Sequence, residues 1–460
     1  MTPARSADAD AGGEPTGSSP ASTLPFLPAA RRRRPLSPWY EHLRDGLWFA
    51  PLVGLASGWA LATLILALDR WIPDYLDRHP DRPWLRDQYD WLLDLASGTK
   101  DTIATMSSAM LTFIGVVFSI TLVALQMASQ FTPRVVRVYV RSRVTKVTFA
   151  MFLTTFLYSL RVQKEFGNSE DHPPALAASL AMGLVVTSLV VFVIYVHSTI
   201  RLMRVTYVIG YVAQESLNLL AARAHAAPVP TPTGEPTAVL PYRGPPGVLQ
   251  DVNVARLVFL ARRHDVVIAL LPRVGDFLTH GMPLAVIHGS PNRRGLPAAT
   301  RVWPCLTLGV ERTMHQDPAF GLRQLVDIAS KALSPAVNDP TTAVQALDRI
   351  HALLTLMSGI ELGDRAHVDR RDRLRLIEPV APWADMVDLG LTEIRLYGAG
   401  APQVTRRLSA ALDDLLDITP PARRPELLRQ RALLHEAVAR AHPDEANRRF
   451  ALEPDRQGIG

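Results

Sequence analysis

The chain has 460 residues, of which 48% are hydrophobic, and a formal net charge of +6. The apolar residues are concentrated between Trp48 and Val205, which is atypical of a soluble protein and indicates a membrane protein with an appended domain. The single cysteine, Cys305, excludes an intramolecular disulfide and a metal site built from several thiolates.

Residues 1–38 are rich in Ala, Pro, Gly and Ser and contain four consecutive arginines, which predicts a disordered basic tail. A membrane domain is predicted over residues 39–226. Its first span, residues 48–68, lies too far from the N-terminus and is too long for a signal peptide. Gly54 and Gly58, continued by Ala62, form a small-residue face against which another helix can pack closely.

Further spans are predicted at residues 103–130, 145–162 and 175–204, the last continuing into a cytoplasmic helix. Residues 72–100 between the first two spans are polar, with tryptophans interspersed, and are expected to form an outside loop with interfacial aromatics. The third span reaches adequate length only if Lys146 and Arg161 extend to opposite interfaces.

The densest unopposed basic cluster follows the second span and includes Arg134, Arg137 and Arg141. Because cytoplasmic loops are enriched in Lys and Arg, this cluster predicts a multi-pass protein of the cell inner membrane with both termini cytoplasmic. No nucleic-acid-binding motif accompanies the arginines, so the lipid bilayer is expected as a partner and nucleic acid is not.

The second span contains polar residues at spacings that place them on one helix face. These residues are Ser108, Thr112, Gly115, Ser119, Gln126 and Gln130. Two interpretations remain open: hydrogen bonding across a helix bundle, or the lining of a hydrated pathway formed by several copies of the chain. In the second case Arg134, Arg137 and Arg141 would form a basic inner mouth that favours anions.

A Pro-rich linker at residues 227–240 precedes the second domain, which is predicted to be small and β-rich over 241–290 and mostly helical over 291–445. Strands are expected at 252–258 and 266–271, and a hairpin at 273–287. The hairpin phrase resembles half of a lipoyl-like barrel-sandwich domain, which implies that fold but no carrier function because the attachment lysine is absent. Residues 446–460 show little pattern and are expected to form a tail.

Helices predicted at 319–333 and 340–356 are joined by a turn in which Asp339 is well placed as an N-cap. The alternative is a small-ligand site in which Arg323, Asn338 and Asp339 converge. The polar run at Arg312, Thr313 and residues 315–317 lacks convergent partners, so no metal is expected. No cofactor-binding or catalytic motif is present, so neither a cofactor nor an enzyme activity is expected.

Three phrases occur in order: FSITLVALQ leading to FTPR (residues 118–134), DPAFGLRQLVDIA (317–329) and LSPAVNDPTTA (333–343). Together they resemble a bacterial family described as predicted membrane proteins with a domain of unknown function. The resemblance implies an inner-membrane protein with a cytoplasmic domain and transfers no catalytic residues.

The predicted fold is an α-helical membrane protein with four transmembrane helices and a C-terminal cytoplasmic α+β domain. The functional hypothesis is a homo-oligomeric inner-membrane channel for small ions or solutes, regulated by its cytoplasmic domain. The alternative is a membrane-anchored scaffold or small-ligand sensor without a pore, in which the polar stripe packs against helices of the same subunit.

Overall fold

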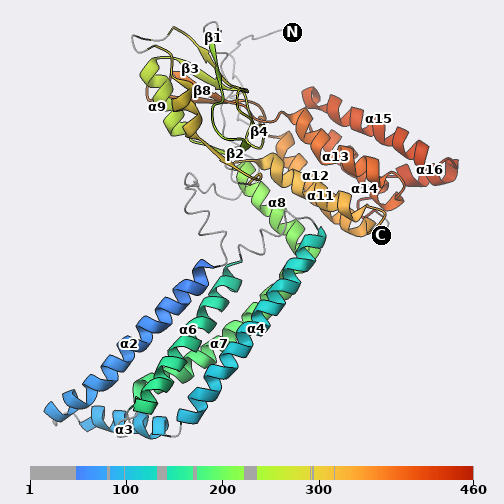
Figure 1. Cartoon of the computed structure of the whole chain (residues 1–460). Coiled ribbons are helices and arrows are strands. Elements are labelled where there is room, and N and C mark those ends of the chain that lie inside the picture. The colour runs from blue at the N-terminus through green and yellow to red at the C-terminus, as the bar shows by residue number, and fades with distance from the viewer. Residues whose placement is uncertain are drawn as a thin grey trace, which may run out of the picture.

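The structure, a computed structural model, describes residues 48–79, 83–97, 99–131, 142–168, 174–221, 236–290, 292, 295–314 and 316–458. Helices α2 (Phe49–Arg78), α4 (Lys100–Phe131), α6 (Arg143–Asn168) and α7 (Ala175–Leu202) lie side by side in a bundle (Figure 1). The β-strands and C-terminal helices form a second region beyond one end of this bundle. We call the opposite end, across which α3 (Pro83–Ser97) lies, the distal end.

Among the described residues, three helices are long and apolar enough to cross a membrane: α2, α4 and α7. Helix α6 has comparable length but does not meet the same criterion because basic residues interrupt its apolar sequence. It nevertheless contacts each of the other three. Composition therefore supports three candidate spans rather than the four expected.

The small-residue face of α2 packs against α6. A Cβ atom at Gly54 would lie 2.5 Å from the Ala150 carbonyl oxygen, and one at Gly58 would lie 2.7 Å from that of Thr154. The close approach lets the Thr154 hydroxyl donate to the Gly54 carbonyl at 2.9 Å. The predicted close packing at Gly54 and Gly58 is confirmed, and its partner helix is identified.

The segment expected as an outside loop is largely helical. Helix α2 continues to Arg78 through Pro73, and α3 occupies most of the remaining segment. The polar composition of α3 conceals an amphipathic pattern, because Tyr89, Leu92 and Leu93 pack against the buried core of the bundle's distal end. Tertiary packing thus stabilises a helix that is only 15 residues long.

The distal end is fastened by a buried carboxylate. Asp69 of α2 is 6% exposed, and its two oxygens accept from the backbone amides of Leu176 and Ala177 at 2.9 and 2.8 Å. These amides open α7, whose own N-cap position is Pro174 and provides no side-chain hydrogen bond. Asp69 therefore caps α7 from a different helix.

At the other end, α7 stops at Leu202, and α8 (Val205–Ala221) begins after a break at Met203 and Arg204. The expected continuation is thus a separate helix. Helix α8 packs on α11 (Pro318–Ala332) and α12 (Pro340–Ser358) of the C-terminal region. A Cβ at Gly321 of α11 would overlap the Ser216 hydroxyl of α8, so the two helices approach closely there.

Two small sheets follow α8. The five-stranded sheet has the order β1 (Pro236–Pro241), β5 (Pro283–His288), β3 (Val267–Leu270), β8 (Leu374–Glu378), β7 (Arg365–Val368). The three-stranded sheet has the order β4 (Phe277–Leu278), β2 (Gly247–Val252), β6 (Leu306–Gly309). Strands β3 and β8 are parallel and the other pairs antiparallel.

The predicted hairpin at 273–287 is wrong, because β4 and β5 belong to different sheets. The domain boundary placed at residue 290 is not a structural division either, since β6, β7 and β8 come from later in the chain. The barrel-sandwich fold implied by the hairpin phrase therefore loses its main support.

The strand expected at 252–258 is also wrong beyond Val252. Asn253 instead caps α9 (Val254–His264), accepting from the Arg256 amide at 3.0 Å. Leu257, Leu260 and Ala261 are buried at helical spacing, so the apolar run belongs to a helix. The signal in the sequence for this helix is Asn253, a residue type favoured at N-caps, directly before the apolar run.

Four of the remaining helices share one core with α11 and α12. They are α13 (Trp383–Gly398), α14 (Pro402–Ile418), α15 (Arg424–Ala441) and α16 (Glu445–Leu452). The short helix α10 (Ala299–Val302) instead adds Val302 to the core of the sheets. Helix α16 lies in the segment expected as a tail; Asp444 caps it, and the Thr405 hydroxyl of α14 donates to its Ala451 carbonyl at 2.7 Å. The C-terminal segment is therefore part of the folded domain.

Candidate functional site

The polar stripe of α4 lies on the exposed side of the bundle. Ser108, Thr112, Gly115, Ser119 and Gln126 are all exposed. Gln130 belongs to the last turn of α4, but its side chain lies outside the described part of the structure, as do Arg134, Arg137 and Arg141 altogether. The structure thus brings five of the predicted residues onto one surface and does not describe the predicted inner mouth.

The hydroxyl groups of this surface bond to their own helix. Ser108 donates to the Ala104 carbonyl at 3.3 Å, Thr112 to that of Ser108 at 3.3 Å, and Ser119 to that of Gly115 at 2.9 Å. Exposure of the five residues shows that this face of α4 is not covered by other described helices of the same chain. It is therefore available to lipid, water or another copy.

A different residue joins α4 to its neighbour. Thr121, on the inner side of α4, lies 2.7 Å from the hydroxyl of Tyr195 in α7, and that hydroxyl lies 3.0 Å from the Val117 carbonyl. Tyr195 is 1% exposed. Sequence spacing did not point to this pair, although a lone tyrosine inside the apolar run of α7 is a signal for a buried hydrogen bond.

The exposed face of α7 differs in chemistry from that of α4. It displays the apolar side chains Val186, Leu189, Val190, Val193 and Ile194. Such a face suits hydrocarbon, whereas lipid offers no hydrogen-bond partners to a glutamine side chain such as Gln126. Within the bundle, α4 therefore presents a more polar exterior than α7.

The end of α4 nearest the C-terminal region is built into that region's core. Ala124 and Ala128 are buried in one cluster with Leu202 and Val208, and the same cluster extends through α11 and α12. Helix α4 also contacts α11 directly. A movement of the C-terminal helices would consequently reach the helix that bears the polar stripe.

In the C-terminal domain, the structure does not bring Arg323 together with Asn338 and Asp339. Arg323 lies in the first half of α11, where it donates to Asp327 at 2.6 Å and to both carboxylate oxygens of Glu393 in α13. This ion pair lowers the pKa of Glu393 and raises that of Arg323. The guanidinium joins two helices.

Asn338 and Asp339 lie beyond the opposite end of α11. Asp339 caps α12, accepting from the Thr342 amide at 3.0 Å and the Thr342 hydroxyl at 2.5 Å. Asn338 has a φ of 48°, a left-handed conformation that Asn tolerates better than most residues. Both residues thus have roles in the turn itself.

The polar run before α11 is structural as well. Asp317 caps α11 through the Phe320 amide at 3.0 Å and also accepts from Arg312 at 2.7 and 2.9 Å. Gln316 accepts from the Val252 amide at 3.1 Å, joining this run to β2. His315 lies outside the described residues.

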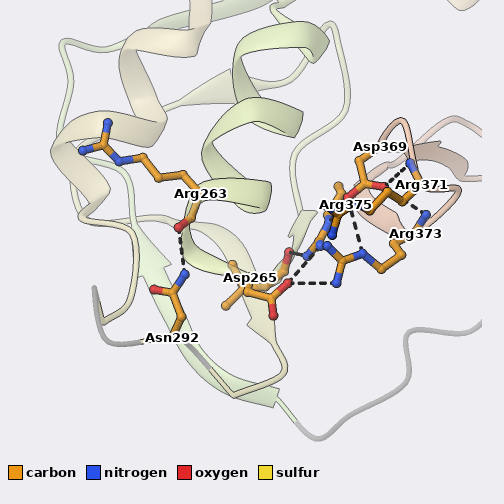
Figure 2. Close-up of polar contacts among 8 residues, drawn as sticks. Arg263, Asp265, Asn292, Asp369, Arg371, Arg373 and Arg375 are labelled. Atoms are coloured by element: carbon orange, nitrogen blue, oxygen red, sulfur yellow. Dashed lines mark hydrogen bonds and ion pairs between the residues drawn. The ribbon is translucent and has the colours of Figure 1, made fainter.

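A charged network at the five-stranded sheet was not predicted from the sequence (Figure 2). Arg375 of β8 is 4% exposed; it donates to Asp369 and to Asp265, at 2.9 Å each. Asp369 also accepts from the amides of Arg371 and Arg373, and the Arg375 hydrogen bond is the main cause that lowers its pKa to about 2. The network fixes the β7–β8 turn against the end of α9.

In the described part of the chain, no three His, Cys, Asp or Glu residues are grouped so that they could hold a metal ion. The charged clusters are accounted for by helix caps and ion pairs. The polar face of α4 differs from these clusters because its residues are uncharged and exposed.

Three apolar helices, one of them with an exposed polar stripe, and a folded C-terminal region define a helical membrane protein. Its sequence agrees with this class. Residues 44–414 match the model of the family described as predicted membrane protein (DUF2254), and the chain belongs to that family.

The relatives do not assign an activity. The chain is 29% identical over 429 residues to the uncharacterized proteins Mb1321c of Mycobacterium bovis and Rv1290c of Mycobacterium tuberculosis. Each match covers 90% of this chain and 80% of the relative. No solved structure matches the chain.

Proposed function

We propose that the protein is a homo-oligomeric channel of the cell inner membrane, in which copies of α4 surround a path for small ions or solutes. The observation behind this proposal is the exposed face of α4, which carries Ser108, Thr112, Ser119 and Gln126. Around a symmetry axis the same face would meet water or its own copies.

In this proposal α6 is a fourth span. Support comes from its position among α2, α4 and α7 and from its close approach to Gly54 and Gly58. The guanidinium carbon of Arg161 lies 5.4 Å from the centre of the Trp59 ring, and this cation–π contact reduces the cost of its charge near hydrocarbon. Four spans place both termini in the cytoplasm.

The C-terminal domain would regulate conduction from the cytoplasm. Support comes from the core that Ala124 and Ala128 of α4 share with α8 and α11. The arginines at the predicted inner mouth would favour anions there. The proposed partners are the lipid bilayer, further copies of the chain and the permeating solute, without a catalytic step, a cofactor or nucleic acid.

Two hydroxyl residues provide a matched test. Ser119 of α4 and Thr187 of α7 are both exposed, and each donates to the carbonyl of a glycine four residues earlier, at 2.9 and 2.8 Å. Only Ser119 lies on the polar stripe. Cysteine is introduced at each position in a Cys305→Ala background, since Cys305 is the single natural cysteine.

In liposomes, a charged thiol reagent that cannot cross the membrane should modify cysteine at 119 and reduce solute flux. Cysteine at 187 should stay unmodified with flux unchanged. Failure of the unmodified protein to pass any ion or solute under voltage or tension would overturn the proposal.

The alternative is a scaffold or small-ligand sensor without a pore, for which the stripe is expected from the sequence to pack against helices of the same subunit. Ser108, Thr112 and Ser119 are exposed instead, so the alternative needs packing against another copy, which one observation favours. The hydroxyls of Ser108, Thr112 and Ser119 are already bonded to their own backbone, so this face could pack against another copy without water. Oligomerisation without flux, combined with an unreactive cysteine at 119, would support this alternative.

A further inference from the structure

We propose that α3 lies in the outer interface of the lipid bilayer, with Trp84 and Trp91 at the boundary between headgroups and acyl chains. The partner is the phospholipid interface itself. The proposal goes beyond conduction, because α3 would occupy this position whether or not the protein passes a solute.

The position of α3 carries the first part of the argument. It joins the distal ends of α2 and α4, both of which are long and apolar enough to cross a membrane (Figure 1). Helix α3 is thus placed where those spans leave the hydrocarbon. Trp71, near the distal end of α2, is also exposed, which adds a third aromatic side chain to this end.

The distribution of side chains around α3 carries the second part. Tyr89, Leu92 and Leu93 pack on the bundle. Trp84 and Trp91 are seven residues apart, share a separate stripe and are 58% and 64% exposed. A large aromatic surface left exposed on a helix beside membrane spans matches the amphipathic interface, where Trp is enriched.

The charges of α3 bear on whether insertion depends on lipid charge or on the apolar interface. Asp87, Asp90 and Asp94 are exposed on a stripe adjoining the tryptophans. Arg86 is the basic residue of α3. An acidic stripe is repelled by anionic headgroups and is well solvated by water. Insertion therefore depends on the tryptophans rather than on attraction to anionic lipid, so added salt should not weaken it.

The corner between α3 and α4 holds α3 in place. The Thr99 amide and hydroxyl both donate to the Ala96 carbonyl, at 3.0 and 2.7 Å, and the Thr99 carbonyl accepts from the Ile103 amide at 2.8 Å. Thr99 and Ile103 are buried. Helix α3 is consequently joined to α4 by a short, hydrogen-bonded corner.

Tryptophan fluorescence of the full chain in liposomes tests the proposal. Three variants each keep one of the eight tryptophans, namely Trp91, Trp59 or Trp383, and have phenylalanine at the other seven positions. Trp59 is exposed in mid-α2 and reports deep lipid, whereas Trp383 is buried in the C-terminal domain and donates to the Arg423 carbonyl. Quenchers are phospholipids brominated near the headgroup or near the chain end, and aqueous iodide.

Trp91 should lose emission mainly to the lipid brominated near the headgroup, Trp59 mainly to the deeper bromine, and Trp383 to neither. The Trp91 pattern should appear with neutral lipid alone, and anionic lipid should not strengthen it. Quenching of Trp91 by iodide alone, or by no quencher, would overturn the proposal and would place α3 in water or against another protein surface.

A second variant guards against misfolding of the multiply substituted chains. Trp91→Cys in the Cys305→Ala background carries a spin label at one exposed position. Greater accessibility to dissolved oxygen than to a polar nickel complex supports interfacial insertion, and the reverse order contradicts it. Flux measured on the same samples separates this outcome from the fate of the channel proposal.

Discussion

At the scale of single residues, substitutions in the turn between α11 and α12 can distinguish a structural helix cap from a ligand-binding site. Asp339 satisfies the first turn of α12, and Asn338 holds a left-handed φ. These two roles make different demands on the side chain. Substitutions that respect the backbone geometry should be tolerated, and those that remove the acceptor should not.

Asp339→Ala should lower the stability of the C-terminal domain by about 1 kcal/mol, the usual effect of losing an N-cap. Asn338→Asp should change it little, since both residues tolerate the left-handed region. Denaturant unfolding of the full chain in detergent measures both. A large functional loss for Asn338→Asp at unchanged stability would instead indicate that Asn338 binds a ligand.

His351 predicts a pH dependence. Its Nδ1 accepts from the Arg407 guanidinium at 3.0 Å, and burial, with Arg407 adding to it, lowers the pKa of His351 below its usual 6.5. In the unfolded chain the imidazole takes a proton more readily. Stability is therefore present above pH 6.5 and is lost as the pH falls from there through the lowered pKa.

The denaturant midpoint for unfolding of the full chain should be lower at pH 5.5 than at pH 7.5. These two values lie about one unit either side of the usual histidine pKa. His351→Gln keeps an acceptor but cannot titrate, so it should show a smaller decrease. An equal decrease in both proteins would show that other groups dominate.

At the scale of elements, the contact between α2 and α6 depends on two glycines. Gly54→Ala would place a methyl group 2.5 Å from the Ala150 carbonyl oxygen, which forces the helices apart. The yield of folded, monodisperse protein should therefore drop. Gly183→Ala in α7 is the matched control, because a Cβ there meets nothing within 4 Å. Similar yields from the two variants would contradict the observed packing.

Elements whose signals are local were predictable from sequence. The apolar spans, the Asp339 cap and the small-residue face of α2 are each determined by one short stretch of the sequence. Which helix meets Gly54 depends on Ala150 and Thr154, about a hundred positions away, and no single sequence states that pairing. The polar face of α4 was predictable, but not that its own chain leaves it exposed.

Strand pairing was the least predictable feature. Strand β8 joins β3 in parallel although more than a hundred residues separate Ile268 from Leu376. The buried Arg375 that secures this region reads in sequence as one of several arginines in a polar stretch. Its role appears only when Asp265 and Asp369 are brought together (Figure 2).

At the scale of the whole molecule, the joint between α8 and α11 unites the bundle with the C-terminal domain. Gly321→Ala should weaken this joint, because the added methyl group overlaps the Ser216 hydroxyl and crowds its Cβ at 3.0 Å. Limited proteolysis should then separate the two regions more readily. Ser216→Gly in the same chain creates the missing space and should restore resistance in part. No rescue would show that the effect arises elsewhere.

The cap that Asp69 provides has a consequence for the order in which the protein is made. Helix α2 leaves the ribosome more than a hundred residues before Leu176 and Ala177. The Asp69 carboxylate therefore lacks these backbone partners while the intervening helices insert. The distal end can close only when the last helix of the bundle meets the first. Nascent chains that end before Ala175 should therefore hold the Asp69 end of α2 loosely, although Gly54 and Gly58 can already pack on α6, and the completed chain should hold it firmly.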